Sequence, residues 1–141
     1  MTTPRKLHLL IVDDDVDLLE PLLEVCARFD FQVSGASSGA RALEILASSE
    51  VDAVLTDVRM QPMGGFALLE NARKLNPALP FILWTGFWDR PDDKRAAAIE
   101  NLEKLEKPFT FAELEVVLAR VRAKIIEAKP ELLRLTDAVD C

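Results

Sequence analysis

Apolar and polar residues follow two alternating patterns along this chain. Residues 7–12, LHLLIV, form a continuous apolar run typical of a buried strand, and residues 16–29 then place apolar side chains at helical spacing. Together they predict a strand, a loop and a helix, and the same order repeats until about residue 128. We expect strands at 7–12, 31–36, 52–56, 80–84 and 103–106, and helices at 16–29, 40–47, 65–75, 90–101 and 110–128.

Helix boundaries are marked by capping residues and prolines. A serine at 37–38 suits the N-cap of the second helix, and Thr110 with Glu113 has the spacing of a capping box before the last helix. Pro130 predicts the end of that helix, because the residue before a proline disfavours helical geometry. Pro21 lies inside the first helix, where we expect it to cause a bend.

Alternating strands and helices predict an α/β fold with a parallel sheet covered on both faces. The leading arrangement is a doubly wound, five-stranded sheet in the flavodoxin-like order 2-1-3-4-5, that is, (βα)5. The charged fifth strand, 103–106, fits an edge position. In this order the first and third strands flank the topological switch point, where ligands bind at the carboxyl ends of strands. Asp13, Asp14 and Asp57 are expected there.

Composition limits the domain count and the classes of partner. A chain of 141 residues, 50% of them hydrophobic, can bury one core, so we predict one domain over residues 1–129 and a short tail or linker over 130–141. The net charge of -7 argues against nucleic acid or an anionic membrane as a partner of this chain alone. With no signal-peptide pattern and no apolar run of about 20 residues, we expect a cytoplasmic location.

The ends of the predicted strands carry residues suited to phosphoryl chemistry. Asp13, Asp14 and Asp57 supply carboxylates, Thr85 a hydroxyl and Lys107 an ammonium group. Carboxylates that meet without a cation repel one another, and Mg²⁺ prefers oxygen ligands of this kind. The residues therefore predict a Mg²⁺ site in which Asp57 is the nucleophile toward a phosphoryl group and forms an acyl phosphate, while Lys107 and Thr85 bind the phosphoryl oxygens.

Each of these residues also has an ordinary structural interpretation. A single aspartate after a strand is often a turn residue, and acids at 13–15 would suit the positive end of a helix. Their occurrence at successive strand ends favours the reaction centre. His8, the only histidine, lies in a strand, and we expect a structural role for it.

Four motifs make the chain resemble the receiver domain of bacterial two-component response regulators. They are IVDDD at 11–15, LTDVRM at 55–60, ILWTG at 82–86 and KPF at 107–109, and the spacing between them also fits that family. The resemblance covers about residues 6–128. It implies a signalling phosphoacceptor that takes part in its own phosphorylation and dephosphorylation, and not an enzyme acting on a separate substrate.

The resemblance also implies roles for individual residues. Asp57 matches the phosphoacceptor, Asp13 and Asp14 match the acidic pair around the metal, and the backbone carbonyl of Arg59 matches a further Mg²⁺ ligand. Thr85 and Lys107 then match the phosphoryl-binding hydroxyl and ammonium. The implied phosphodonor is a phosphohistidine on a sensor histidine kinase or a phosphotransfer protein, and phosphorylation would switch binding to an output protein that the sequence does not identify.

The chain departs from the family at the residues expected to transmit phosphorylation. Lys104 stands where an aromatic reporter is frequent in this family, three residues before Lys107 of the KPF motif. Trp88 is a candidate replacement as an interface anchor, or else a half-buried loop residue that closes the core. Arg59 and Phe87 occupy positions that tune water access to the acyl phosphate in this family, and their bulk predicts slow self-dephosphorylation. Phe87 is also a third candidate switch or output residue, with Lys104 and Trp88.

Two other functions remain open at this point. A haloacid-dehalogenase-type phosphohydrolase would use Asp13 and Asp15 as nucleophile and acid/base, and a constitutive interaction domain would never use phosphate. The tail places apolar residues at helical spacing, which can pack back on the domain or pair with a second copy in a homodimer. The chain is expected to act as a stand-alone receiver or as part of a larger regulator.

Overall fold

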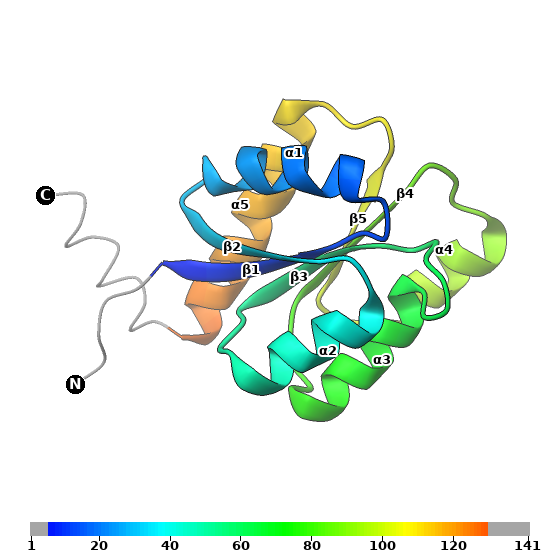
Figure 1. The fold of residues 1–141 in the computed structure, drawn as a ribbon, viewed down its shortest axis with the longest axis horizontal. Coiled ribbons are helices and arrows are strands. Elements are labelled where there is room, and N and C mark those ends of the chain that lie inside the picture. The colour runs from blue at the N-terminus through cyan, green and yellow to red at the C-terminus, as the bar shows by residue number, and fades with distance from the viewer. Residues whose placement is uncertain (1–5, 130–141) are drawn as a thin grey trace, which may run out of the picture.

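The computed structural model describes residues 6–129 as a parallel sheet covered by helices (Figure 1). The five strands have the order β2-β1-β3-β4-β5, so the predicted doubly wound (βα)5 fold is confirmed. In chain order the elements are β1 (Leu7–Val12), α1 (Val16–Ala27), β2 (Phe31–Ala36), α2 (Gly39–Ser48), β3 (Ala53–Asp57), α3 (Gly65–Leu75), β4 (Phe81–Thr85), α4 (Arg90–Ala97), β5 (Leu102–Glu106) and α5 (Phe111–Ala128).

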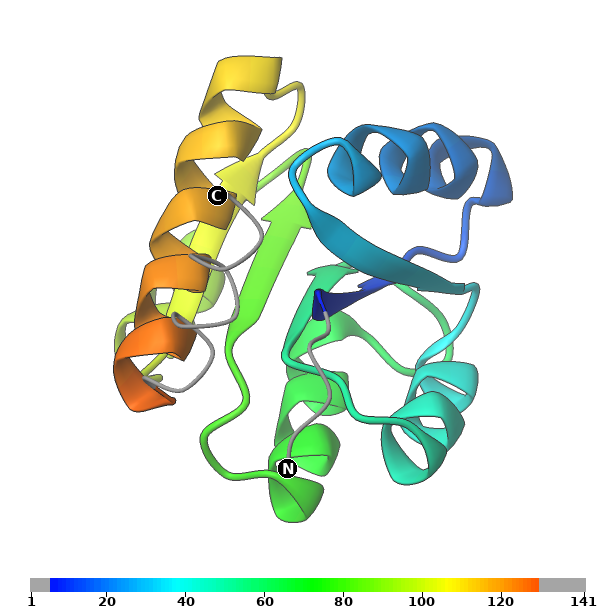
Figure 2. The same ribbon diagram turned by 90° about the vertical axis from the view of Figure 1, so that its left-hand side faces the viewer.

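The sheet separates two apolar layers. Successive side chains of a strand point to opposite faces, so Leu9 and Ile11 of β1 pack with residues of α1 and α5, whereas Leu10 and Val12 pack with residues of α2 and α3. Figure 2 shows these two helical layers on either side of the sheet. β1, β3 and β4 are buried along their whole length, which explains why they read as continuous apolar runs.

The register brings the carboxyl ends of the central strands together. Val12 at the end of β1 pairs with Thr56 of β3, and Asp57 pairs with Trp84 of β4. Thr85 in turn pairs with Glu106 of β5. The residues after β1 and β5 and the last residues of β3 and β4 therefore meet at one edge of the sheet.

Most element boundaries agree with the predicted ones to within two residues, and α4 is the main exception. It ends at Ala97 rather than near residue 101, because the chain must turn before β5 pairs with β4. Asn101 makes this turn with φ 54, and its carbonyl accepts a hydrogen bond from the Phe81 amide at 3.0 Å. Asp57 and Thr85, predicted to follow their strands, are the last residues of β3 and β4.

The predicted capping residues act as N-caps. The Ser38 hydroxyl accepts from the Arg41 amide, and the Thr110 hydroxyl accepts from the Glu113 amide. Pro21 lies within α1, as its position in the sequence indicated. The predicted tail over residues 130–141, with its apolar Leu132, Leu135 and Val139, lies outside the described residues. Among the helices that the structure describes, none is long and apolar enough to cross a membrane.

Candidate functional site

Three carboxylates converge at the carboxyl edge of the sheet. Asp13 and Asp14 directly follow β1, and Asp57 ends β3; one carboxylate oxygen from each lies within 4.8 Å of the others. Asp13 and Asp57 are buried, whereas Asp14 is exposed. The acidic group predicted from the sequence is therefore assembled.

Backbone amides hold two of these carboxylates in place. Oδ1 of Asp13 accepts from the Asp15 amide at 2.9 Å, and Oδ1 of Asp57 accepts from the Arg59 amide at 2.9 Å. The loop after Asp57 returns close to the strand at Gly65, where an added Cβ would lie 2.5 Å from the Asp57 carbonyl oxygen. The glycine thus allows α3 to begin directly against the backbone of Asp57.

The Lys107 side chain reaches the carboxylates from the end of β5. Its Nζ lies 3.1 Å from Oδ2 of Asp57 and 3.7 Å from Oδ2 of Asp13. The same ammonium lies 3.9 Å from the centroid of the Trp84 ring, which fits a cation–π contact. A positive charge is therefore in direct contact with the predicted phosphoacceptor.

Asp13 is a buried carboxyl group that lies close to two other carboxylates. Burial raises its pKa most, the nearby Asp57 and Asp14 raise it further, and the Asp15 amide and Lys107 only partly oppose them. Oδ2 of Asp13 is buried without a hydrogen-bond partner. A buried carboxylate oxygen that accepts no hydrogen bond, within a cluster of hard oxygen donors, fits a divalent cation such as Mg²⁺.

Thr85 is the last residue of β4, the strand that pairs with β3, and its side chain is buried. Its hydroxyl donates to the Phe87 carbonyl and accepts from the Phe87 amide, both at 3.3 Å. These are long bonds within a local turn. The hydroxyl is therefore held weakly enough to exchange partners, and its role in binding phosphoryl oxygens stays a prediction.

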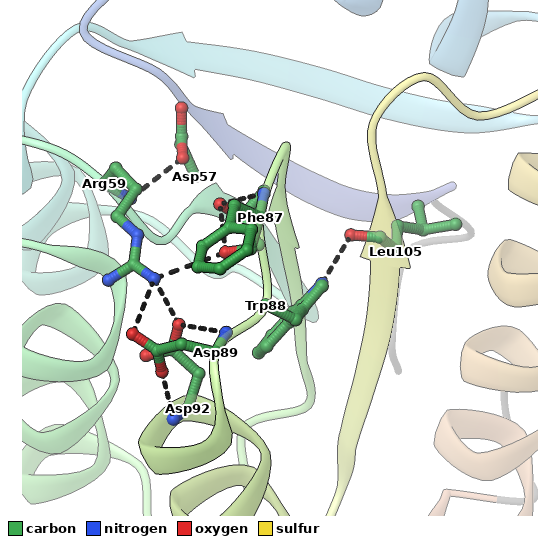
Figure 3. Close-up of polar contacts among 8 residues, drawn as sticks. Asp57, Arg59, Phe87, Trp88, Asp89, Asp92 and Leu105 are labelled. Atoms are coloured by element: carbon green, nitrogen blue, oxygen red, sulfur yellow. Dashed lines mark hydrogen bonds and ion pairs between the residues drawn. The ribbon is translucent and has the colours of Figure 1, made fainter.

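The Arg59 side chain runs from the acceptor loop to the start of α4 (Figure 3). Its Nη2 donates to the Phe87 carbonyl at 3.2 Å and pairs with the carboxylates of Asp89 and Asp92. Figure 3 shows the guanidinium pointing away from Asp57. The role of the Arg59 backbone carbonyl as a metal ligand stays a prediction.

Asp89 and Asp92 are functional candidates that the sequence reasoning missed. Asp89 is the N-cap of α4, and the two side chains accept reciprocally from each other's backbone amides in a capping box. The Asp92 amide, first among the causes, lowers the pKa of Asp89. Their spacing of three residues at a helix start is a signal that could have identified them.

The three candidate output residues differ in exposure. Phe87 is 68% exposed, whereas Trp88 is half-buried and packs against the core. The Trp88 indole donates to the Leu105 carbonyl at 3.2 Å (Figure 3), and Lys104 Nζ lies 5.5 Å from the centroid of its ring. Lys104 also pairs with Asp93 at 3.1 Å. Trp88 therefore links the β4–α4 loop to β5.

His8 has the structural surroundings expected from its strand position. Its Nδ1 lies 2.9 Å from the Glu50 carbonyl, and its Nε2 lies 2.7 Å from the Ser34 hydroxyl. Both ring nitrogens are thus engaged between neighbouring segments, away from the acidic cluster.

Comparison with known proteins points to one family. The family described as response regulator receiver domain matches residues 9–119. The chain is 33% identical over 121 residues to the transcriptional regulatory protein ZraR of Escherichia coli K12, an alignment that covers 86% of this chain and 27% of that protein. It is 37% identical over 142 residues to the transcriptional regulatory protein GlrR of the same strain, covering 92% and 32%. The chain thus spans only about a third or less of these relatives.

Solved structures show the same fold. The signal receiver domain of an HD domain-containing protein from Pseudomonas fluorescens Pf-5 superposes with a TM-score of 0.81 at 27% identity, covering 87% of this chain and 99% of that one. A response regulator receiver protein from Sinorhizobium medicae WSM419 superposes with a TM-score of 0.75 at 30% identity, covering 84% and 96%.

Proposed function

Because the chain belongs to the response regulator receiver domain family, it is a signalling phosphoacceptor domain of a two-component system, and we propose that Asp57 is the residue phosphorylated. The observation that carries this assignment is the contact of Lys107 with Asp57 inside the acidic cluster. Of the cluster's carboxylates, Asp57 lies closer to the ammonium than Asp13 does.

We propose that Mg²⁺ binds to Asp13, Asp14 and Asp57, with the Arg59 carbonyl as a further ligand. The convergence of the carboxylates supports this, as does the buried Oδ2 of Asp13, which accepts no hydrogen bond. When bound, the cation would offset the charge of the carboxylates and of the incoming phosphoryl oxygens. The carboxylates would then tolerate a further anion beside them.

Three residues of the chain would carry out the phosphoryl transfer itself: Asp57, Lys107 and Thr85. A carboxylate oxygen of Asp57 attacks phosphorus, so an O–P bond forms while the N–P bond of a phosphohistidine breaks and the imidazole leaves with the electron pair. Lys107 then pairs with a phosphoryl oxygen, and Thr85 donates its hydroxyl hydrogen bond to another. Lys107 already contacts Asp57 in the unphosphorylated protein, whereas the Thr85 hydroxyl would exchange its bond to the Phe87 carbonyl for one to the phosphoryl group.

A sensor histidine kinase or a phosphotransfer protein is the proposed phosphodonor. Such an exchange fits the cytoplasm, where the buried free thiol of Cys26 would stay reduced. The hydrolase alternative has no support: the family match is to a receiver, and the Asp15 carboxylate caps α1 by accepting from the Asp17 amide.

The output surface of this proposal is centred on Trp88 and Lys104. Trp88 joins the β4–α4 loop to β5, and Lys104 lies over its ring on the exposed side. A change in the loop beside Asp57 would therefore move an aromatic side chain and a charge that an output protein or domain can contact.

We also propose that the acyl phosphate hydrolyses slowly. Arg59 and Phe87 extend from the two loops that border Asp57, and both carry bulky side chains. They would limit the approach of water in line with the O–P bond. Rapid loss of phosphate from the purified protein would contradict this.

Intact-mass spectrometry after incubation with acetyl phosphate and Mg²⁺ tests the proposed function. The wild-type chain should gain one phosphoryl group, whereas Asp57→Asn should gain none. Asp93→Asn, which removes an exposed carboxylate outside the cluster, is the matched control and should react like wild type. A chain that never gains the group, with or without Mg²⁺, would instead be a constitutive interaction domain.

A further inference from the structure

Arg59 is bonded to the predicted phosphoacceptor at one end and to the start of α4 at the other. Its backbone amide donates to Oδ1 of Asp57 at 2.9 Å. Its guanidinium, six bonds farther along the side chain, pairs with Asp92 and lies 3.4 Å from Oδ2 of Asp89 (Figure 3). Arg59 therefore bridges the acceptor, through its backbone amide, and α4, through its side chain.

Asp89 and Asp92, the acids that pair with Arg59, also cap the N-terminus of α4. Asp89 accepts from the Asp92 amide at 2.7 Å, and Asp92 accepts from the Asp89 amide at 3.3 Å. Asp92 is buried, so its charge depends on a close cation more than a surface carboxylate would. The Arg59 guanidinium thus stabilises the arrangement in which these residues cap α4.

The Phe87 carbonyl connects this ion cluster to the phosphoryl-binding hydroxyl. It accepts from Thr85 at 3.3 Å and from Arg59 at 3.2 Å. If the Thr85 hydroxyl donates to a phosphoryl oxygen instead, Arg59 alone holds this carbonyl. The conformation of the loop from Thr85 to Asp89 then depends on the position of the Arg59 guanidinium.

A phosphoryl group on Asp57 would compete for that guanidinium. It carries up to two negative charges and three acceptor oxygens, and guanidinium groups bind such oxygens in a forked geometry. The Arg59 side chain is 50% exposed, so it can rotate without opening the core. Its backbone is already in contact with the acceptor carboxylate.

We propose that Arg59 is a positioning residue that clamps the β4–α4 loop in the unphosphorylated state and moves to the phosphoryl oxygens when Asp57 is phosphorylated. Its departure releases Phe87, Asp89 and Asp92, so the loop and the first turn of α4 loosen. This device would take the place of an aromatic reporter at Lys104. It rests on the proposed function, because it requires a phosphoryl group on Asp57.

Hydrogen–deuterium exchange of the segment 87–93, measured on the full chain with and without acetyl phosphate and Mg²⁺, tests the clamp. Loss of a partly exposed ion cluster should make this segment of the wild type exchange about two- to fivefold faster on phosphorylation. Arg59→Met should exchange at the faster rate already without phosphate and should not change on phosphorylation. Arg59→Lys, which keeps the charge without the fork, should give an intermediate response.

Arg95→Met is the matched control. Arg95 ties α4 to Glu70 of α3 by an ion pair and packs on Phe66, yet it contacts no residue of the clamp that the structure describes. This variant should keep the wild-type response. If it loses the response as well, or if Arg59→Met still responds like wild type, the clamp is contradicted.

The phosphoryl adduct is measured by intact mass on the same samples. If the adduct forms and segment 87–93 exchanges at an unchanged rate in wild type, the clamp fails and the proposed function stands. If no adduct forms in any variant, the proposed function itself fails and the clamp fails with it.

Discussion

The Lys107 ammonium lies 3.1 Å from Oδ2 of Asp57, although 50 residues separate the two in the chain. The parallel sheet brings them together, because β3 and β5 both end at the edge where the acidic cluster lies. The contact gives the acceptor carboxylate a counter-charge before any phosphoryl group arrives.

Lys107→Met should slow phosphorylation from acetyl phosphate about 100-fold, because charge developing on the phosphoryl oxygens would lose a preorganised partner. The rate of adduct formation by intact mass measures this. Lys104→Met also removes a lysine charge, from within β5. Because Lys104 contacts Asp93 and Trp88 instead of the cluster, the rate of this variant should match wild type. Equal rates for both variants would exclude the assigned role of Lys107.

Asp13→Asn should make the metal-free protein more stable at neutral pH. Burial raises the pKa of Asp13, so its stabilising contribution is present at low pH and is lost as pH rises through the raised pKa. The variant stays neutral and avoids this loss, and its Tm should exceed that of wild type by a few degrees. Thermal unfolding in EDTA provides the measurement.

The same pair of proteins should respond differently to pH and to Mg²⁺. As the pH falls through the raised pKa of Asp13, the carboxyl of the wild type gains a proton and the difference in Tm should shrink. Added Mg²⁺ should raise the Tm of wild type and leave that of Asp13→Asn nearly unchanged. A variant less stable than wild type in EDTA at neutral pH would show that Lys107 already compensates the charge of Asp13.

Trp88→Phe tests whether Trp88 stabilises the folded domain or serves only as a contact residue for a partner protein. The substitution removes the indole hydrogen bond to the Leu105 carbonyl, so we expect a loss of about 1 kcal/mol in the free energy of unfolding by urea. Phe87→Ala, at a highly exposed neighbour, should change that value by less than about 0.5 kcal/mol. An unchanged stability in Trp88→Phe would assign Trp88 to an interface alone.

The position of the candidate site residues at one edge of the sheet could be predicted from the sequence, because apolar runs mark where strands end and parallel strands bring those ends together. Each of four site residues either ends a strand or directly follows one: Asp13, Asp57, Thr85 and Lys107. An error of one residue in a predicted strand boundary therefore does not move them from this edge of the sheet. The end of α4 was predicted wrongly, because the turn at Asn101 follows from pairing between β4 and β5 and not from local periodicity.

The clamp could not be predicted from periodicity. Arg59 lies in the loop before α3 and Asp89 in the loop before α4, and the meeting of their side chains depends on how both loops leave the sheet. The spacing of Asp89 and Asp92 in the sequence indicates a capping box, but nothing in that pattern indicates that Arg59 pairs with these acids. Ion pairs between loops depend on tertiary geometry that a single sequence pattern does not contain.

Mapping the phosphoryl adduct to one residue tests the central claim most directly. After reaction with acetyl phosphate and Mg²⁺, borohydride converts an aspartyl phosphate to homoserine, and peptide mass spectrometry locates the converted residue. The account predicts homoserine at position 57, and its absence in Asp57→Asn. Conversion at Asp13, Asp14 or Asp15 with Asp57 intact would contradict it.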